Sequence, residues 1–410
     1  MHCALRSIVL TLAALAWPWA AVAVDHPGTR FRVDFADLPA PGATTSANNT
    51  ARTIPRPANA TLEVPPGFKV IMFAQGLSNA RWLVAAENGD VFVAEPAAGR
   101  VTLLRDADGD GIAEVARTYI SGLDRPHGLA IVAGYLYVTT PTTILRYPRR
   151  PGEVTPAGPP QGLGGRNPLG DGQGHFTRNL AIAPDGRQIF VAVGSRTNLS
   201  AEAAPRATIQ SFDINGTAQQ TFAAGLRNPV GLAFRPGSND LYTVVNERDG
   251  YGDGLVPDYF TVARQGDFFG WPFAYLGPHP SQGVLGLQRP DLVLSAKAPD
   301  VLFEAHSAPL GLAFYEGAQF PAEYHGDAFV ALHGSWNSGR PTGYKVVRIP
   351  FGTDGRPTGE YVNFATGFWV GGDKTAEVFG RPVGLAIAAD GALLIADDVG
   401  NVIWRVSYGR

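Results

Sequence analysis

The stretch GLRNPVGLAFRPGSNDLYTVV, residues 225–245, holds two runs of apolar and β-branched residues separated by a turn of Pro, Gly, Ser, Asn and Asp. This arrangement is typical of a β-hairpin. Similar stretches occur at five other places along the chain. They read GLSNARWLVAAENGDVFVAE (76–95), GLDRPHGLAIVAGYLYVTT (122–140), HFTRNLAIAPDGRQIFVAV (175–193), SAPLGLAFYEGAQF (307–320) and GRPVGLAIAADGALLIADD (380–398).

The repeat predicts the fold class. Most copies are followed by a further strand-like run, as at 100–104, 144–147, 345–349 and 402–406. Four strands per repeat, recurring every 45 to 80 residues or so, are what a propeller blade requires, and blades pack around an axis because one blade cannot bury both faces. Six copies therefore predict an all-β, six-bladed β-propeller. A β-solenoid or a pair of sandwiches is the alternative, and the recurring Gly-Leu-Ala turn favours the propeller.

Composition agrees with this fold and narrows the choice of partners. The 410 residues include 50 Gly and 33 Pro, which suits many short strands joined by turns. The formal net charge is −3. Nucleic acids and anionic membranes are recognised by a concentrated basic face, so this balance argues against either as the main partner.

The N-terminus has the features of an exported protein. Residues 1–23 read as a signal peptide, with an apolar run at 8–16 and the small-residue cleavage pattern AVA at 21–23. That run is too short to be a convincing membrane span. Cleavage near Ala23 would remove Cys3, the only cysteine, and we expect a periplasmic or secreted protein. Residues 24–62, rich in Pro, Ala, Thr and Asn, read as an extended arm, and residues 63–410 as the propeller domain.

Two motifs at the start of predicted inner strands carry candidate catalytic groups. His175, in GHFTRN (174–179), can act as a general base if it faces the axis, or it can bond to a neighbouring blade. Arg227 and Asn228, in LRNPVG (226–231), offer a planar fork of donors and an amide to a developing oxyanion, or a salt bridge at a blade turn.

Two acidic turns are candidates for calcium, which prefers oxygen ligands. The first, NERDG (246–250) with Asp253 and Asp258 after it, combines carboxylates with exposed carbonyls, and its alternative is a solvated acidic loop. The second carries Asp106, Asp108, Asp110 and Glu114. Its first half resembles a calcium loop, but Glu114 comes too early for an EF-hand, which leaves a structural calcium site or a solvated turn.

A third group of residues lies in and after a long loop. His333, Lys345 and Arg381 are basic and could hold an anionic cofactor, and Trp336 could stack on a ring or pack in the core. Long intervals at 246–305 and 315–345 are where a rigid scaffold usually carries its function. The sequence lacks a Gly-rich phosphate loop, HExxH, GxSxG and a CxxCH haem motif, so nicotinamide, zinc-protease and serine-hydrolase chemistries have no support.

From about residue 64 onward the chain resembles the sorbosone dehydrogenase and soluble glucose dehydrogenase family of quinoproteins, most closely its sorbosone dehydrogenase-like branch. The stretches that carry the resemblance are GHFTRNLAIAPDGRQIFVAVGS (174–195), GLRNPVGLAFRPGSNDLYTVVNERDGYGDGLVPDYFT (225–261), FFGWP (268–272), HGSWN (333–337), PTGYKVVRIPF (341–351) and GRPVGLAIAADG (380–391). The resemblance implies a six-bladed propeller with pyrroloquinoline quinone (PQQ) on the axis and calcium against it.

It also implies roles for individual residues. His175 matches the family's catalytic base, and Arg227 with Asn228 matches the pair that contacts the quinone oxygens. Backbone carbonyls near Arg248 and Asp249 would bind the cofactor calcium, and Arg381 would hold a cofactor carboxylate. Hydride would then pass from the sugar or alcohol carbon to the quinone, and a separate cytochrome or quinone would accept the electrons.

The sequence departs from the family at three places. Gly174 stands where soluble glucose dehydrogenases carry an acidic residue, and Val230 with Gly231 replaces a Gln. The family's cofactor-binding Lys has no clear counterpart, because His333, Arg340 and Lys345 compete for its place. Two other functions are open: a calcium-dependent propeller lactonase, and a non-catalytic propeller that binds protein or glycan.

Overall fold

The computed structural model describes residues 25–409 and consists mainly of short β-strands. The predicted signal peptide, residues 1–23, lies outside the described residues. The helices of the described part are short: the 3₁₀ turns η1 (Phe35–Asp37), η2 (Pro96–Ala98) and η3 (Ala322–Tyr324), and the α-helices α1 (Leu285–Gln288) and α2 (Pro290–Ser295). None of them is long and apolar enough to cross a bilayer. The all-β prediction is confirmed.

Residues 25–409 contain six sheets of four or five strands. The first is β4 (Trp82–Ala85), β5 (Val91–Glu95), β6 (Arg100–Arg105) and β7 (Val115–Ile120). The second is β8 (Leu129–Val132), β9 (Tyr135–Thr139), β10 (Ile144–Pro148) and β11 (Gln161–Leu163). The third is β12 (Leu180–Ile182), β13 (Gln188–Val193), β14 (Thr208–Asp213) and β15 (Gln220–Ala224), with β19 (Asp267–Phe268) at its edge.

The other three sheets follow the same antiparallel order. The fourth is β16 (Asn228–Phe234), β17 (Leu241–Asn246), β18 (Tyr259–Ala263) and β22 (Val301–Leu302). The fifth is β23 (Pro309–Phe314), β24 (Ala328–Leu332), β25 (Lys345–Ile349) and β26 (Tyr361–Ala365), extended by β1 (Arg30–Phe31). The sixth is β29 (Pro382–Ile387), β30 (Leu393–Asp397), β31 (Val402–Tyr408) and β3 (Phe68–Gln75).

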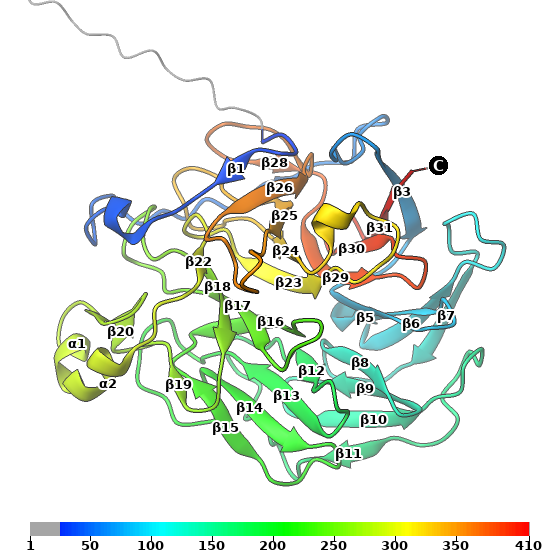
Figure 1. Ribbon diagram of the computed structural model, residues 1–410, viewed down its shortest axis with the longest axis horizontal. Coiled ribbons are helices and arrows are strands. Elements are labelled where there is room, and N and C mark those ends of the chain that lie inside the picture. The colour runs from blue at the N-terminus through cyan, green and yellow to red at the C-terminus, as the bar shows by residue number, and fades with distance from the viewer. Residues whose placement is uncertain (1–24, 410) are drawn as a thin grey trace, which may run out of the picture.

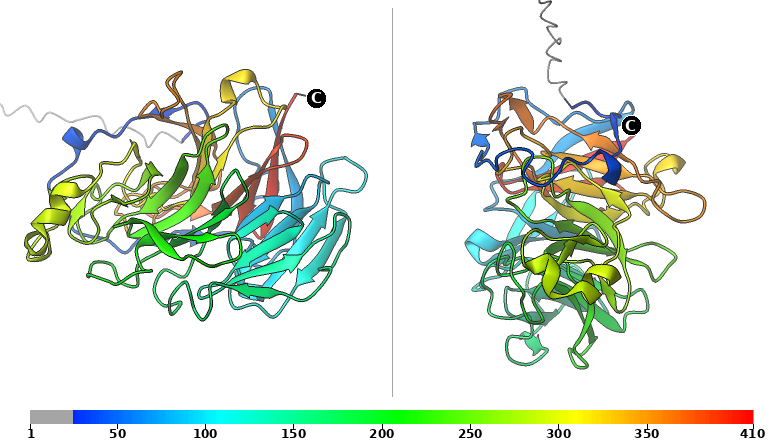
Figure 2. Two further views of the ribbon diagram at one scale, coloured as in Figure 1. Left: turned by 60° about the horizontal axis from the view of Figure 1, so that its bottom comes forward. Right: turned by 90° about the vertical axis from the view of Figure 1, so that its left-hand side faces the viewer.

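The six sheets are arranged in a ring (Figure 1). The strands β4, β8, β12, β16, β23 and β29 each contact the next in this order, and β29 contacts β4. Six separate hydrophobic clusters fill the spaces between successive sheets. Two further views show the sheets stacked face to face around the centre (Figure 2). Each sheet therefore buries both faces against its neighbours.

This packing explains the sequence pattern of the middle strands. All residues of β5, β24 and β30 are buried, because both faces of these strands meet another sheet. Their sequences are accordingly near-continuous apolar runs instead of alternating ones. The hairpin turns use glycines in the left-handed region, for example Gly186 (φ +69°) and Gly391 (φ +90°).

The sixth sheet joins the two ends of the described chain. β3 pairs with β31 in antiparallel register, from Phe68 opposite Tyr408 to Gln75 opposite Val402. The N-terminal strand thus completes a sheet whose other three strands come from the C-terminal end of the chain.

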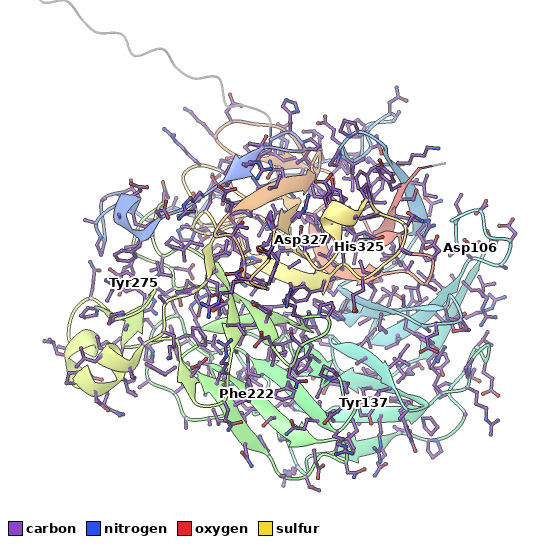
Figure 3. All side chains as sticks on the ribbon, in the orientation of Figure 1. Asp106, Tyr137, Phe222, Tyr275, His325 and Asp327 are labelled. Carbon is purple, nitrogen blue, oxygen red and sulfur yellow. The ribbon has the colours of Figure 1, made fainter. Side chains whose placement is uncertain are left out.

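The N-terminal arm, residues 25–62, lies on the ring. β1 extends the fifth sheet by pairing with β26, and β2 (Arg52–Thr53) pairs with β28 (Glu377–Val378), which also pairs with β27 (Trp369–Gly371). The segment between β19 and β22, residues 269–300, is an insert that contains α1, α2, β20 (Ala274–Tyr275) and β21 (His279–Pro280) and forms one edge of the molecule. Figure 3 shows Tyr275 on this insert and Asp106 at the opposite edge.

Candidate functional site

His175 and Arg227 meet at Ser195. His175 lies five residues before the first residue of β12, and its Nδ1 lies 2.8 Å from the carbonyl oxygen of Ser195. The backbone N–H of His175 donates to the same oxygen at 3.1 Å, and the N–H of Ser195 donates to the carbonyl of Arg227 at 2.7 Å. A carbonyl can only accept, so Nδ1 carries the proton and Nε2 keeps its lone pair.

The imidazole of His175 is held in its neutral form. Burial, and then the positive charge of Arg227, lowers its pKa to about 4. His175 is nevertheless half-buried, not enclosed. At neutral pH, Nε2 is therefore an unprotonated acceptor on a half-buried side chain, as a general base requires.

Arg227 is fixed by a network that the sequence did not reveal. Its side chain is almost fully buried, and Nη2 donates to Asp249 Oδ2 at 2.7 Å and to Asn198 Oδ1 at 2.9 Å. Asn198 also binds the backbone of Asp249, since its Oδ1 accepts from the N–H and its Nδ2 donates to the carbonyl, both at 2.9 Å. The guanidinium therefore has one orientation, with a counter-charge beside it.

Asn228 has an unsatisfied polar atom at this point. Its Oδ1 is buried and has no hydrogen-bond partner among the described residues. A Cβ added to Gly194 would lie 2.4 Å from this Oδ1 and 2.7 Å from the Cβ of His175. Glycine at 194 thus allows His175 and Asn228 to approach. The orphaned Oδ1 of Asn228 is an acceptor and needs an N–H or O–H donor from a ligand, whereas the guanidinium of Arg227 beside it suits carbonyl or carboxylate oxygens.

The turn after β17 offers oxygen atoms for a cation. Within residues 25–409 the carbonyl of Asp249 accepts only from Asn198, and its carboxylate accepts from Asn337 Nδ2 at 2.5 Å as well as from Arg227. Arg248 has its side chain turned away and fully buried, where Nε donates to Glu247 at 2.8 Å and Nη1 to Ser281 at 2.6 Å. The backbone at residue 248 is therefore anchored. The carbonyl and carboxylate oxygens of this turn are the kind of ligand that a hard cation such as calcium prefers.

A second corner joins His333 and Arg381. His333 Nε2 lies 2.9 Å from Asp398 Oδ1, and Arg81 Nη1 lies 2.7 Å from Asp398 Oδ2. Arg381 Nε donates to the carbonyl of His333 at 2.9 Å, and its guanidinium lies over the ring of Tyr344. Burial, and then Arg381, lowers the pKa of His333 to about 4. The structure thus brings these two predicted cofactor-binding residues together.

Lys345 and Trp336 are placed differently. Lys345 is buried, and its Nζ lies 2.6 Å from the carboxylate of Asp25 in the arm and 3.8 Å from that of Glu304. The structure places it against the arm and shows no contact with His175 or Arg227. Trp336 is 49 % exposed, so its ring is available to stack on a planar group.

The residues whose roles sequence reasoning missed are Asn198, Asn337, Asp398 and Arg81. Asn337 ends the HGSWN stretch and Asp398 and Arg81 lie in hairpin repeats, but nothing in those patterns marks them as partners of the charged groups, and only the fold brings them together.

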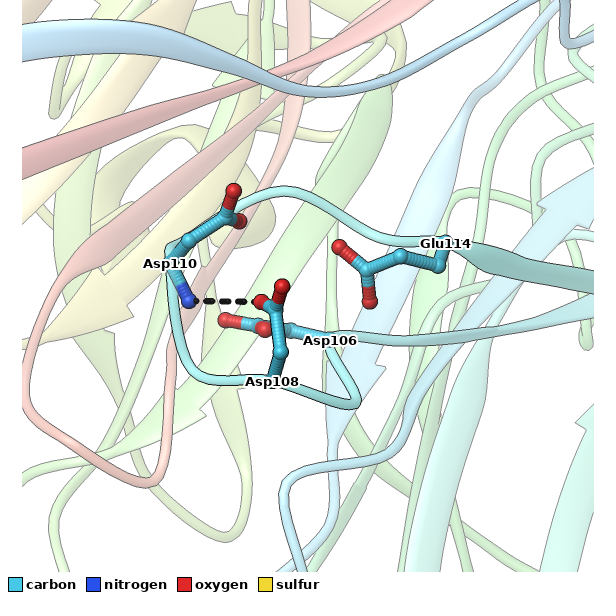
Figure 4. Close-up of side chains that lie close together, drawn as sticks. All are labelled: Asp106, Asp108, Asp110 and Glu114. Carbon is cyan, nitrogen blue, oxygen red and sulfur yellow. Dashed lines mark hydrogen bonds between the residues drawn. The ribbon is translucent and has the colours of Figure 1, made fainter.

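The second acidic turn is compact and exposed. The carboxylates of Asp106, Asp108, Asp110 and Glu114 can each offer one oxygen within 4.8 Å of the others (Figure 4). Asp106 accepts from two backbone N–H groups, of Gly109 at 2.7 Å and Gly111 at 2.8 Å, which holds the loop in shape. It lies between β6 and β7, away from His175 and Arg227 in the sequence and on a different sheet.

Comparison with known proteins gives the family. The model of the TrAA12-like family matches residues 62–254 and 293–409. This chain belongs to the TrAA12-like family. The matched residues include His175, Arg227 and Arg381, whereas the arm and much of the insert lie outside the match.

Two sequence relatives and one solved structure are similar over most of the chain. An uncharacterized protein from Borreliella burgdorferi is 30% identical, with 85% of this chain and 92% of that protein covered. A pyrroloquinoline quinone-dependent pyranose dehydrogenase from Coprinopsis cinerea is 26% identical over 84% of this chain, which spans 54% of that enzyme. The calcium structure of a carbohydrate-active enzyme of family AA12 from Trichoderma reesei is 21% identical with a TM-score of 0.72, covering 87% of this chain and 100% of that one.

These comparisons place the TrAA12-like chain among relatives that include PQQ-dependent sugar dehydrogenases, and the structural likeness shows a shared fold. They do not extend to the sorbosone dehydrogenase-like branch, which stays a prediction.

Proposed function

We propose that this TrAA12-like protein is a PQQ- and calcium-dependent dehydrogenase that oxidises an aldose, sorbosone or a related sugar or alcohol. The observation that carries the proposal is the contact of Nδ1 of His175 with the carbonyl of Ser195, which leaves Nε2 free to accept a proton beside Arg227. The pyranose dehydrogenase named above supports PQQ as the cofactor and a sugar as the substrate.

The residues of the chain would divide the chemistry as follows. When bound, PQQ supplies the two-electron acceptor. Nε2 of His175 takes the proton of the substrate hydroxyl. Arg227, held by Asp249, donates to an oxygen on which negative charge develops. The Nδ2 of Asn228 donates a hydrogen bond to the neighbouring quinone oxygens. Arg381 supplies a positive charge for a cofactor carboxylate.

Calcium has two proposed sites. The cofactor ion would be held by the backbone carbonyls of Arg248 and Asp249, and a structural ion by the loop that begins at Asp106. The calcium structure of the Trichoderma reesei enzyme supports calcium as the metal.

The overall organisation belongs to the same proposal. The six sheets would be the blades of a six-bladed propeller covering residues 63–410, preceded by the arm and by a signal peptide removed near Ala23. The mature protein would then act in the periplasm or outside the cell. We propose a cytochrome or quinone as the acceptor of its electrons.

Reconstitution tests this function. The purified protein is titrated with PQQ and calcium, and a panel of aldoses and sorbosone is offered with a reducible dye. We expect dye reduction that requires PQQ, calcium and a sugar. Hydrolysis of lactones without PQQ would favour the lactonase instead, and the absence of both PQQ binding and turnover would favour a non-catalytic binding propeller.

A further inference from the structure

The N-terminal arm crosses three loops, of which the first two carry residues of the proposed site. These are the 249-loop (residues 249–254, after β17), the 333-loop (residues 333–340, after β24) and the 371-loop (residues 371–376, from the last residue of β27 to the start of β28). Residues 42–49 of the arm bond to all three. The family match begins at residue 62, so this segment is a feature of the chain outside the matched region.

The first contact joins the arm to the 249-loop. The N–H of Gly42 donates to the carbonyl of Tyr251 at 2.7 Å, and Thr44 Oγ1 accepts from the N–H of Asp253 at 2.7 Å. Gly252 has φ +104°, and a Cβ there would lie 2.8 Å from Thr44 Oγ1. The arm therefore lies directly on the backbone of this loop, and only glycine permits such an approach.

The second contact is made by Asn49. Its N–H donates to the carbonyl of Trp336 at 2.7 Å, and its Nδ2 donates to the carbonyls of Ser338 at 2.9 Å and Lys374 at 2.7 Å. Its Oδ1 accepts from Thr375 Oγ1 at 2.7 Å. One side chain thus joins the 333-loop to the 371-loop. The adjacent Asn48 is exposed and makes no hydrogen bond with other residues of the range 25–409.

The 333-loop is coupled in turn to the catalytic network. Asn337 Nδ2 donates to Asp249 Oδ1, and the N–H of Gly339 donates to Asp253 Oδ1 at 2.8 Å. Asp249 is the residue that holds Arg227. A shift of the 333-loop would therefore move Trp336, and it would also weaken the contact that orients the guanidinium.

We infer that Asn49 is a positioning residue for the cofactor site, because it holds the 333-loop, which carries Trp336 and bonds to Asp249 through Asn337. This inference rests on the proposed function for the identity of the ligand, PQQ. The bracing itself is independent of any ligand, since every contact named above is made within the chain.

The adjacent asparagines give a matched test in the full-length protein. Asn49→Ala and Asn48→Ala are compared for PQQ affinity in the presence of calcium, by quenching of tryptophan fluorescence. We expect Asn49→Ala to weaken binding about tenfold or more, because three side-chain hydrogen bonds are lost, and Asn48→Ala to stay within about twofold. At saturating PQQ, the turnover number of Asn49→Ala should return to within about threefold of the wild type.

Hydrogen exchange of the cofactor-free proteins separates this inference from the proposed function. Amides of residues 335–340 should exchange faster in Asn49→Ala only. That result in a protein that does not bind PQQ would sustain the bracing and reject the proposed function. Equal exchange and equal PQQ affinity in the two alanine variants would overturn the inference. If Asn49→Ala does not fold, Asn49→Asp, which keeps the acceptor and loses the two amide donors, decides between the same outcomes.

Discussion

Replacing His175 by Gln tests the proposed base with little disturbance of the fold. A glutamine amide can still donate to the carbonyl of Ser195, which accepts from Nδ1 in the native protein. It cannot take up a proton. General-base catalysis contributes roughly 100- to 10,000-fold, which corresponds to about 3–5 kcal/mol of barrier. We expect turnover with a saturating sugar and a dye acceptor to fall by that factor, while PQQ affinity stays within about threefold.

The pH profile adds a second readout to this test. Because the pKa of His175 is lowered to about 4, the base is unprotonated at neutral pH and becomes protonated only in acid. Wild-type turnover should therefore be flat above about pH 6 and fall as the pH drops through about 4. The variant should lack this acidic limb.

A control residue has the same local geometry. His279 Nδ1 lies 3.1 Å from the carbonyl of Leu276 in the insert, remote in sequence from His175. His279→Gln should keep turnover within about twofold of the wild type. If His175→Gln binds PQQ normally and retains a third or more of wild-type turnover, His175 is not the base and the proposed chemistry is refuted.

Three further predictions concern stability. The pKa values of His175 and His333 are lowered to about 4 and that of His127 to about 3, against an ordinary 6.5, so at these three sites the unfolded chain binds more protons in acid. Asp258 and Asp397, whose pKa values are raised to about 7 and about 6, act in the opposite direction but are fewer. Tm should therefore fall as the pH drops from about 6.5 to 4, and the triple variant with all three histidines replaced by Gln should lose that fall; a Tm that rises over this range in the wild type contradicts the prediction. Gly174→Asp should lower Tm by several degrees, because its Cβ would lie 2.4 Å from a backbone carbonyl oxygen. Gly165 also has a positive φ but has open space around it, so Gly165→Asp should lower Tm less, and equal losses of Tm in the two variants would refute the clash. Calcium should raise the Tm of the cofactor-free protein, and EGTA should reverse the effect. The Tm of Asp106→Asn should respond much less to calcium, and a wild-type Tm that calcium does not change argues against an ion in the loop of Asp106.

The fold class was predictable because the repeat encodes local structure. Each hairpin needs only apolar strand residues and a turn such as the one at Gly186, and both are read directly from the sequence. The meeting of His175 and Arg227 follows from the same repeat. His175 lies five residues before β12 and Arg227 directly before β16, and residues that lead into the first strands of neighbouring sheets lie at the same end of the ring.

The partners of these groups were not predictable. Arg227 is held by Asn198, which lies 29 residues away between β13 and β14. Lys345 is paired with Asp25, which lies 320 residues away in the arm. Single polar residues in loops have no periodicity, and only the closed arrangement of the sheets decides which of them meet. The departure at Gly174 is explained by the same closeness, because a side chain there would collide with the backbone of Arg196.

The pairing of β3 with β31 determines when the structure can be completed. These strands are separated by more than 300 residues, so the last sheet cannot form until nearly the whole chain has been synthesised. Until then β3 has an unpaired edge, which is a site for pairing with another chain. A circular permutant that places β3 directly after β31 would remove this delay, since all four strands of the sheet would then be consecutive.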